Sequence, residues 1–340
     1  MKVLIHEWVT GGGLAGNDLP RSLAAEGNAM RLALTREFSC VQGVEVISTL
    51  DVRFKQEIPH TKSIPVRRGE EESILARLAR DCDFTLLIAP ETDDLLASRA
   101  ELIARVGGHS LGSSAEAIRL TADKFQFAAH LSAAFIPTPP SARFRPSQGL
   151  PQEFAYPAVV KPIDGAGAIQ TYYCENANDL PVDPALPEQM LIQTFFKGRA
   201  LSVNFLVDKS RRPICLGIGA QNMVLEAKRF VYDGGVVQSP GPSVAHETLA
   251  ALMSVHGLSG WVGVDFLQSL EDDSITILEI NPRPTTSLVG ILALYEPGVI
   301  ARAWLSGVAG ETTEVPVPRR FHKVKFTADG TILSGLGHKS

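Results

Sequence analysis

The first third of the chain alternates short apolar runs with longer segments in which apolar residues recur at helical spacing. Strands are predicted over residues 2–9, 44–49 and 84–89, with a further short strand just before residue 112. Helices are predicted between them, over residues 21–38, 69–82 and 95–107. Because strand and helix alternate, the pattern predicts an α/β fold here, a doubly wound domain with a parallel sheet and helices on both faces, at about residues 1–115.

The pattern changes after residue 115. One helix is predicted over residues 117–134, and it ends at the proline-rich segment 136–146. From Tyr156 onward, strands and turns replace the alternation, and a hairpin-like pair of strands closes the series. The C-terminal part of the chain is therefore predicted to be α+β.

The last predicted hairpin, "GWVGVDFLQSLEDDSITILEINPRP" (260–284), contains an acidic turn between two apolar strands. If the turn centres near Asp272, antiparallel pairing places Asp265 opposite Glu279. Alternation along the strands then places Glu279 and Asn281 on the same face as Asp265. Three oxygen donors on one face suit a hard divalent cation such as Mg²⁺. The alternative is an edge hairpin with solvated polar residues; the apolar strands disfavour it, because buried carboxylates need a partner.

A glycine-rich loop follows the predicted strand that ends at Lys161. The loop runs through Asp164, Gly165, Ala166, Gly167 and Ala168, whose small side chains allow backbone amides to close over a phosphate. A lysine adds a point charge to such a site. A second lysine, Lys124, lies on the predicted helix 117–134, and the strand through Gln193, Thr194, Phe195 and Phe196 offers backbone groups to an adenine edge. Without the other segments, a lysine before a glycine turn is equally explained by an ordinary hairpin with no phosphate site.

The order and spacing of these segments resemble the ATP-grasp superfamily of carboxylate–amine ligases. The matching stretches are "ADK" (122–124), "VVKPIDGAGA" (159–168), "IQTFFKG" (192–198), "GVDF" (263–266) and "LEINPRP" (278–284). The resemblance implies that a two-lobed ATP-grasp domain follows the N-terminal domain, with a small lobe at 116–190 and a large lobe at 191–340. It also implies ATP and one or two Mg²⁺ ions as cofactors, with Mn²⁺ as a substitute.

The same resemblance implies a role for each matching residue. Lys124 and Lys161 would bind the nucleotide phosphates, under a lid formed by Gly165, Ala166 and Gly167. The adenine would lie along Gln193, Thr194, Phe195 and Phe196, and the Mg²⁺ ligands would be Asp265, Glu279 and Asn281. Arg283 would be the catalytic arginine that faces the transferred phosphoryl group. Arg199 and Ala200 stand where relatives often carry a ribose-binding acid, so the ribose contact is unassigned.

The opening stretch "HEWVTGGGLAGNDLP" (6–20) carries G-x-G-x-x-G at Gly11, Gly13 and Gly16, and Asp51 ends the next strand. This is the outline of a dinucleotide-binding motif, which makes an NAD-dependent oxidoreductase the alternative function. However, polar residues intervene between the apolar strand and the first glycine. A polar strand end at the carboxyl edge of a parallel sheet favours substrate binding.

In that interpretation Glu7 holds a substrate ammonium, and the loop of Thr10, Gly11, Gly12 and Gly13 holds a carboxylate. For each glycine, a tight turn that needs its backbone freedom is the competing explanation. The "HEWVTGGG" opening also resembles a subgroup of ATP-grasp ligases that joins glutamate to an amine such as tyramine in the synthesis of a one-carbon-carrier cofactor. Shorter matches in that subgroup add Glu91, in "LLIAPETDDLLA", and Gly234 and Gly235, in "YDGGVVQSP", to the expected substrate-binding residues.

Composition narrows the classes further. The 340 residues carry a formal net charge of −5 without a long basic run, so small-molecule amino acid and amine substrates are expected rather than nucleic acid. The four cysteines are far apart and contain no C-x-x-C pair, which predicts free thiols and a cytoplasmic location. No segment has a run of apolar residues long enough for a membrane span. The sequence also lacks the G-x-S-x-G motif that would indicate a serine hydrolase. Relatives make a homodimer possible by analogy.

Overall fold

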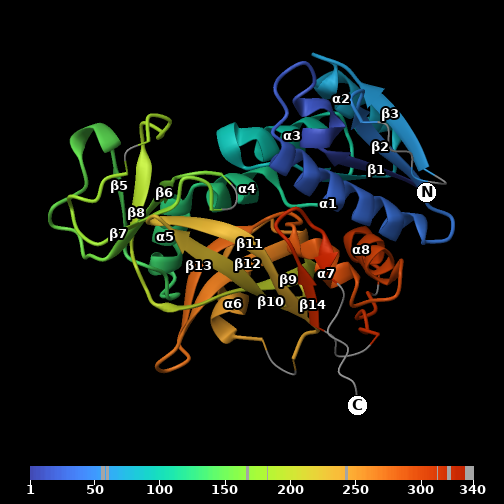
Figure 1. The fold of residues 1–340 in the computed structure, drawn as a ribbon. Helices are drawn as coiled ribbons and strands as arrows, with labels where there is room; N and C mark the ends of the chain where they lie inside the picture. Colours follow the sequence, from blue (N-terminus) through green and yellow to red (C-terminus); the bar gives the residue numbers. More distant parts are fainter. Residues whose placement is uncertain are drawn as a thin grey trace.

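The computed structural model describes residues 1–54, 58, 61–165, 168–181, 183–241, 244–311, 313–319 and 323–333. Two β-sheets dominate it, one parallel and one antiparallel, and helix α1 (Arg21–Ser39) lies between them (Figure 1). This confirms the predicted mixed fold, with a parallel-sheet domain ahead of an antiparallel one.

The N-terminal sheet has four parallel strands in the order β3-β2-β1-β4. Their bounds are β1 (Lys2–Glu7), β2 (Glu45–Asp51), β3 (Thr61–Val66) and β4 (Phe84–Ile88). β3 was not predicted, because it is an edge strand with mostly half-exposed side chains, a proline and no apolar run. The short strand expected before residue 112 is a single parallel bridge between Thr85 and Ser110.

Helices cover both faces of this sheet, as predicted. Helix α1 packs on the face that carries Val3 and Ile5, whereas α2 (Glu71–Asp81) and α3 (Leu95–Arg105) pack on the face that carries Leu4. Successive residues of a strand point to opposite faces, so the even-numbered His6 faces α2 and the odd-numbered Glu7 faces α1.

The second sheet has eleven strands, and the nine along its main path follow the order β13-β12-β9-β10-β11-β7-β6-β8-β5. The strands are β5 (Ser141–Phe144), β6 (Ala158–Pro162), β7 (Tyr172–Cys174), β8 (Met190–Thr194), β9 (Gly198–Val207), β10 (Pro213–Glu226), β11 (Arg229–Gln238), β12 (Gly260–Ser269), β13 (Ile275–Asn281), β14 (Lys323–Phe326) and β15 (Ile332–Leu333). β8 pairs with both β5 and β6, which lie within the expected small lobe, and residue 190, where that lobe was expected to end, is the first residue of β8.

The single helix predicted over residues 117–134 is two helices, α4 (Ala115–Ala122) and α5 (Lys124–Ala133). Asp123 separates them, because its side chain accepts hydrogen bonds from the backbone amides of Phe125 and Gln126 and so begins a new helix. Gln126 donates back to the Asp123 carboxylate at 2.7 Å. The break fixes Lys124 in the first turn of α5.

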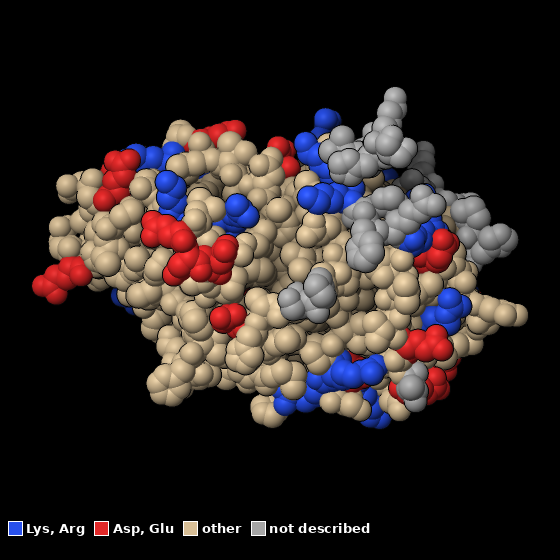
Figure 2. Space-filling view, turned by 90° about the horizontal axis from the view of Figure 1, so that it is seen from below, with Lys and Arg blue, Asp and Glu red and all other residues tan. Residues whose placement is uncertain are grey.

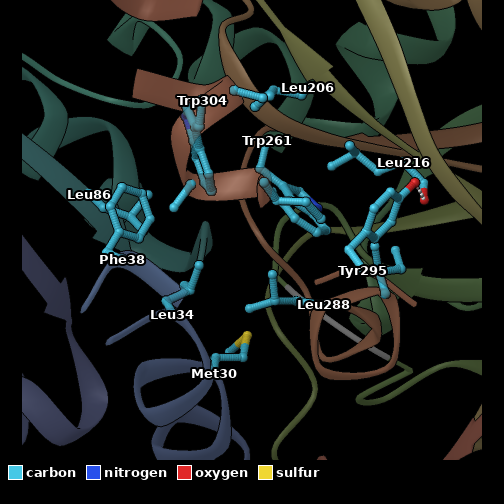
Figure 3. Packing of buried hydrophobic residues seen from close by; sticks show 14 of the residues in the cluster. Met30, Leu34, Phe38, Leu86, Leu206, Leu216, Trp261, Leu288, Tyr295 and Trp304 are labelled. Carbon is cyan, nitrogen blue, oxygen red and sulfur yellow. Dashed lines mark hydrogen bonds between the residues drawn. The ribbon is translucent and has the colours of Figure 1, made fainter. Parts of the chain in front are cut away.

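Helices also cover both faces of the large sheet. Helices α4, α5 and α6 (His246–Ser254) share one apolar cluster with β9, β12 and β13. On the opposite face, α7 (Ser287–Leu292) and α8 (Val299–Ala309) share a second cluster with α1, where Met30, Leu34 and Phe38 meet Trp261 and Trp304 (Figure 3). The ring centres of Phe38 and Trp304 are 5.9 Å apart.

A buried carboxylate strengthens the contact between α1 and α8. Glu37 of α1 accepts hydrogen bonds from the backbone amides of Gly298, Ile300 and Ala301 at 2.9–3.0 Å. These amides lie at the N-terminus of α8, where the helix leaves them without partners of its own and its dipole favours negative charge. The parallel-sheet domain is therefore held against the large sheet by both apolar and polar contacts.

Charged side chains of both signs are interspersed on the face shown in Figure 2, with wide uncharged areas between them. Cys40, Cys82, Cys174 and Cys215 all carry free thiols, as predicted. Over the described part of the chain, no helix is both long enough and apolar enough to cross a membrane.

A buried ionic network under the N-terminal sheet predicts acid sensitivity. The His6 ring contacts Thr49 at 2.7 Å and Glu71 at 3.0 Å, and Arg99 also donates to Glu71. Burial opposes ionisation of Glu71, but hydrogen bonds from His6 and Arg99 outweigh it and lower its pKa to about 2. Because the folded-state pKa lies below the ordinary glutamate pKa of 4.5, the stabilisation is complete above pH 4.5 and is lost as the pH falls toward 2.

We expect Glu71→Gln to remove most of this acid dependence. Urea unfolding of the wild type at pH 6 and pH 3.5 should show a drop in stability that is roughly 1 kcal/mol or more larger than the drop in the variant. Glu72→Gln, on the same helix but at a more exposed side chain, is the matched control. An equal drop in all three proteins would contradict the assignment.

Candidate functional site

The predicted acidic hairpin is present, and Asp265 lies opposite Glu279 as predicted. β12 and β13 pair Asp265 with Glu279, and Phe266 with Ile277, so the register shifts by one residue at a bulge that contains Leu278. The amide nitrogen of Asn281 donates to Asp265 at 3.1 Å, which confirms that these two side chains share a face. Gln221 of β10 also hydrogen-bonds the Asp265 carboxylate, a partner that the sequence did not indicate.

Both predicted lysines lie beside this hairpin. Lys124 Nζ is 3.7 Å from Glu279 Oε2, and the side chain of Glu279 is 22% exposed. Burial lowers the pKa of Lys161 to about 8, with Glu279, Lys124 and Asp265 as its charged neighbours. Burial and the Glu279 carboxylate raise the pKa of Asp265 to about 7, whereas Lys124 and Lys161 outweigh burial and lower the pKa of Glu279.

This charge arrangement fits a divalent cation. The charge of Glu279 raises the pKa of Asp265, so the two carboxylates repel each other when no cation is between them. A cation there would satisfy both carboxylates, and the Asn281 amide is a third potential oxygen donor. The described residues contain no group of three His, Cys, Asp or Glu side chains placed to hold a metal. The protein alone therefore offers a partial ligand set, as expected where substrate phosphates complete it.

The predicted phosphate lid is held by contacts on two sides. Lys124 Nζ donates to the carbonyl of Gly165 at 2.7 Å, and the Asp164 carboxylate accepts from the amide of Asp93 at 3.1 Å. Gly165 has φ of +101°, and a side chain there would approach Thr92 Oγ1 to 3.2 Å. Ala166 and Gly167, the other predicted lid residues, lie outside the described residues.

The segment 90–94 follows β4 and contacts three parts of the candidate site. Glu91 accepts from Arg283 Nε at 2.8 Å and from the second guanidinium nitrogen at 2.7 Å, with both side chains buried. Asp94 pairs with Arg119 of α4, and Asp93 contacts the lid. Asp93 and Asp94 have φ of 54° and 59°, a strained conformation typical of segments that the surrounding structure holds in place. The two predicted residues Arg283 and Glu91 therefore meet each other.

The predicted adenine strand is β8 and the residues after it. The amide of Thr194 donates to the Pro140 carbonyl and that of Phe195 to the Pro157 carbonyl, so these two amides already have protein partners. Gln193 is buried and donates to Ser141, whereas Phe196 is 42% exposed.

The opening glycine loop is packed rather than open. Residues Val9–Gly13 form a π-helical turn, and both oxygens of the Glu7 carboxylate accept hydrogen bonds from it, from Val9 and Thr10. A side-chain carbon at Gly11 would lie 2.5 Å from Thr49, at Gly12 2.3 Å from Val66, and at Gly13 2.1 Å from Trp8. These contacts explain the glycines by close packing. Substrate binding by Glu7 and Thr10 stays a prediction, since both side chains are buried.

The acid that a dinucleotide-binding site would require, Asp51, is also engaged in contacts within the protein. Both Asp51 oxygens accept hydrogen bonds from Arg53, whose guanidinium also donates to the carbonyls of Leu14 and Asn17. Asp51 therefore anchors the end of the glycine loop instead of presenting a carboxylate to a ribose.

The glycine positions on β11 are also tightly packed. A side-chain carbon at Gly234 would lie 2.1 Å from the Phe326 carbonyl, and one at Gly235 2.5 Å from the Ala220 carbonyl. Gly235 pairs with Gln221, the residue that hydrogen-bonds Asp265, so this strand lies next to the hairpin site. Lys228, in the turn between β10 and β11, forms ion pairs with Asp179 and Glu175.

We expect Gly12→Ala to destabilise the protein more than a glycine replacement in open space. Gly12 has φ of +107° and faces Val66, whereas Gly43 has φ of +80° with nothing within 4 Å of the added carbon. Gly43→Ala should cost about 1–2 kcal/mol for its backbone conformation alone. Gly12→Ala should cost about 1–3 kcal/mol more because of overpacking. Urea unfolding of both variants measures the difference, and equal losses would show that the loop relaxes away from β3.

Comparison with known proteins agrees with this arrangement. Residues 121–287 match the ATP-grasp domain family, and residues 44–118 match the pre ATP-grasp 3 domain family. The chain therefore belongs to the ATP-grasp superfamily and carries a pre-ATP-grasp domain ahead of its ATP-grasp domain. ATP-grasp domains in general bind ATP and Mg²⁺.

Two curated relatives are tyramine–L-glutamate ligases. The one from Methanocaldococcus jannaschii is 29% identical over 287 residues, which is 82% of this chain and 82% of the relative. The one from Methanocaldococcus fervens is 30% identical over 212 residues, 62% of this chain and 61% of the relative. Together with the family match, these relatives support an ATP-dependent carbon–nitrogen ligase and leave the oxidoreductase alternative without support.

Solved structures share the fold at low identity. An ATP-grasp superfamily protein from Archaeoglobus fulgidus superposes with a TM-score of 0.67 at 23% identity, covering 96% of this chain and 92% of that one. An L-amino acid ligase from Bacillus licheniformis superposes with a TM-score of 0.65 at 14% identity, covering 96% and 74%.

Proposed function

We propose that the protein joins the carboxylate of glutamate to an amine such as tyramine or tyrosine, with cleavage of ATP to ADP and phosphate. The observation that carries the ligase assignment is the cluster of Lys124, Lys161, Asp265 and Glu279 beneath the lid contact of Gly165. The glutamate and amine assignment rests on the two curated relatives.

A carboxylate reacts slowly with an amine because its negative charge repels a nucleophile and it lacks a good leaving group. Attack of a carboxylate oxygen on the γ-phosphorus of ATP breaks the bond to the bridging oxygen, releases ADP and gives an acyl-phosphate. The neutral amine then attacks the acyl carbon, the carbon–oxygen bond to phosphate breaks, and the phosphate departs with the proton of the amine.

The residues of this chain would act mainly by positioning and by charge cancellation. Lys124 and Lys161 would bind phosphate oxygens, and Arg283 would face the phosphoryl group in transfer while Glu91 holds its guanidinium in place. Asp265, Glu279 and Asn281 would hold Mg²⁺, which supplies further positive charge to the phosphates when bound. The cluster brings together side chains of β6, β12, β13 and the first turn of α5.

ADP release with Mg²⁺–ATP tests the proposal. The purified protein is incubated with glutamate and with tyramine, tyrosine or other amines, singly and in pairs, and amide products are identified by mass spectrometry. ADP formation that requires glutamate and one amine together, and that is absent in Glu279→Ala, is the expected result. ADP formation with a carboxylate other than glutamate would support the ligase activity but show that glutamate is not the substrate. Failure of every pair to yield an amide would overturn the proposal.

A further inference from the structure

A small group of buried polar side chains lies between α1 and the N-terminal sheet. Gly27 of α1 faces Glu7 so closely that a side-chain carbon there would lie 2.6 Å from the carboxylate. One and two turns further along the same helix face, Arg31 and Thr35 are fully buried. Ser48 of β2 shares the strand face of Val46, which packs with α1, so its buried side chain also faces α1.

The hydrogen-bonding capacity of this group is only partly used. Arg31 donates from one terminal nitrogen to Asn28 at 2.8 Å. Within the described chain, the Nε and the other terminal nitrogen of Arg31 have no acceptor, and the hydroxyl of Thr35 has no partner. Buried arginine donors without acceptors are rare, because each one loses its hydration without replacement.

The charges of the group are unbalanced in a way that points to a dipolar occupant. Burial raises the pKa of Glu7 despite its bonds to Thr10 and Val9, and burial lowers the pKa of Arg31 despite the nearby Glu7. Burial therefore opposes the charge of both groups, and their mutual attraction does not compensate for it. An added ammonium near Glu7 and an added carboxylate near Arg31 would stabilise both charges.

The group also lies next to the candidate active site. Glu26, the residue before Gly27, accepts a hydrogen bond from the Thr286 hydroxyl, and its charge acts on Arg283. Arg283 and Thr286 lie on the segment that follows β13, which carries Glu279. A ligand between Glu7 and Arg31 would thus extend toward the reaction centre along the first turns of α1.

We propose that Glu7 and Arg31 form the binding site for the amino-acid head of the substrate, with Arg31 holding the carboxylate that is not activated and Glu7 the ammonium. This inference rests on the proposed function. Entry requires the Val9–Gly13 turn to release the Glu7 carboxylate, so that the substrate ammonium replaces the hydrogen bonds of Thr10. Arg283 and Lys124 are engaged elsewhere, since Arg283 pairs with Glu91 and Lys124 with Gly165 and Glu279.

Steady-state kinetics of amide formation tests the site. Arg31→Met should raise KM for glutamate by about tenfold to a hundredfold, the loss expected for a charge-assisted hydrogen bond, while KM for ATP stays within twofold. Thr35→Val, which removes only an unpartnered hydroxyl, should raise KM for glutamate severalfold with an unchanged melting temperature. Arg36→Met, an exposed arginine on the same helix, is the matched control and should leave KM unchanged.

Substrate analogues separate recognition from folding. Relative to glutamate, 4-aminobutyrate lacks the α-carboxylate and 2-aminobutyrate lacks the γ-carboxylate. The analogue that keeps the activated carboxylate should be a much poorer substrate of the wild type than glutamate. Arg31→Met should lose that discrimination, because the residue that reads the second carboxylate is gone, even if its overall activity falls.

The outcomes distinguish this inference from the proposed function. If the wild type forms amides from glutamate and Arg31→Met and Thr35→Val keep both KM and discrimination, the space holds water only and the inference is overturned. If the wild type forms no amide from glutamate, the proposed function fails first. Arg31→Lys keeps the charge, so its KM for glutamate should lie between those of the wild type and Arg31→Met. If Arg31→Lys has the KM of the wild type and Arg31→Met does not fold, Arg31 has a structural role only.

Discussion

Glu279→Gln and Asp265→Asn should each lower ATP-dependent amide formation by about a hundredfold to a thousandfold or more. Each substitution removes a carboxylate from the only pair of acids on the paired face of the hairpin formed by β12 and β13. Losing one such group from a preorganised, charged site costs about this much in other enzymes. ADP release with the substrates identified for the wild type measures the effect.

The fold should survive both substitutions. Burial and Glu279 raise the pKa of Asp265 to about 7, so the ionised aspartate destabilises the cation-free protein at neutral pH. Asp265→Asn should therefore unfold at an equal or higher urea concentration than the wild type. Mg²⁺ should raise the melting temperature of the wild type in the presence of ATP and have a smaller effect in either variant.

Asp272→Asn is the matched control for this prediction. Asp272 lies in the turn of the same hairpin, where its exposed carboxylate accepts hydrogen bonds from Ser274 and Ser269. Its replacement should leave turnover unchanged. Wild-type rates in both Glu279→Gln and Asp265→Asn would exclude these residues as the metal ligands.

Part of the candidate metal site followed from a local rule, because a two-residue period places Glu279 and Asn281 on one face of β13. The Asp265–Glu279 pair did not follow from the turn alone. The pairs nearest the turn, such as Phe266 with Ile277, would continue to Asp265 opposite Leu278, and the bulge at Leu278 instead places Asp265 opposite Glu279. The apolar strands and the acidic turn contain no signal for such a bulge.

The sequence does contain a local signal for the break that divides residues 117–134 into two helices. Asp123 followed three residues later by Gln126 is a capping-box pattern, and the two side chains are hydrogen-bonded at 2.7 Å. The continuous apolar spacing across the junction concealed it. Strand β3 had no comparable signal, because an exposed edge strand with a proline lacks the apolar period that identifies strands.

The opening glycine loop could not be interpreted from its own residues. Gly11, Gly12 and Gly13 are required by Thr49, Val66 and Trp8, two of which come from other strands. A phosphate-binding loop and a tightly packed turn both need glycine, so the sequence pattern is the same for both. Arg31 was overlooked for a related reason, since a single arginine within an amphipathic helix is usually exposed.

Substitution of Arg283 should lower both turnover and stability, because this residue is expected to have a catalytic role and a structural role. Arg283→Met should lower turnover by about a hundredfold to a thousandfold, the scale of losing one fixed cation from a phosphoryl-transfer site. It should also destabilise the protein by about 3–5 kcal/mol, because the buried carboxylate of Glu91 then has no counter-charge.

The double variant Glu91→Met with Arg283→Met separates these effects. Removing both charges restores much of the lost stability, since buried ion pairs replaced by apolar side chains of similar volume are often close to neutral. If Arg283 acts on the phosphoryl group, turnover of the double variant stays as low as that of Arg283→Met. If Arg283 serves only to hold the segment 90–94 against the ATP-grasp domain, turnover recovers together with the urea midpoint. Glu91→Gln, which keeps a hydrogen-bond acceptor for the guanidinium, should retain the fold and lose less activity than either. Near-wild-type turnover of the double variant would therefore transfer the phosphoryl role to Lys124 and Lys161.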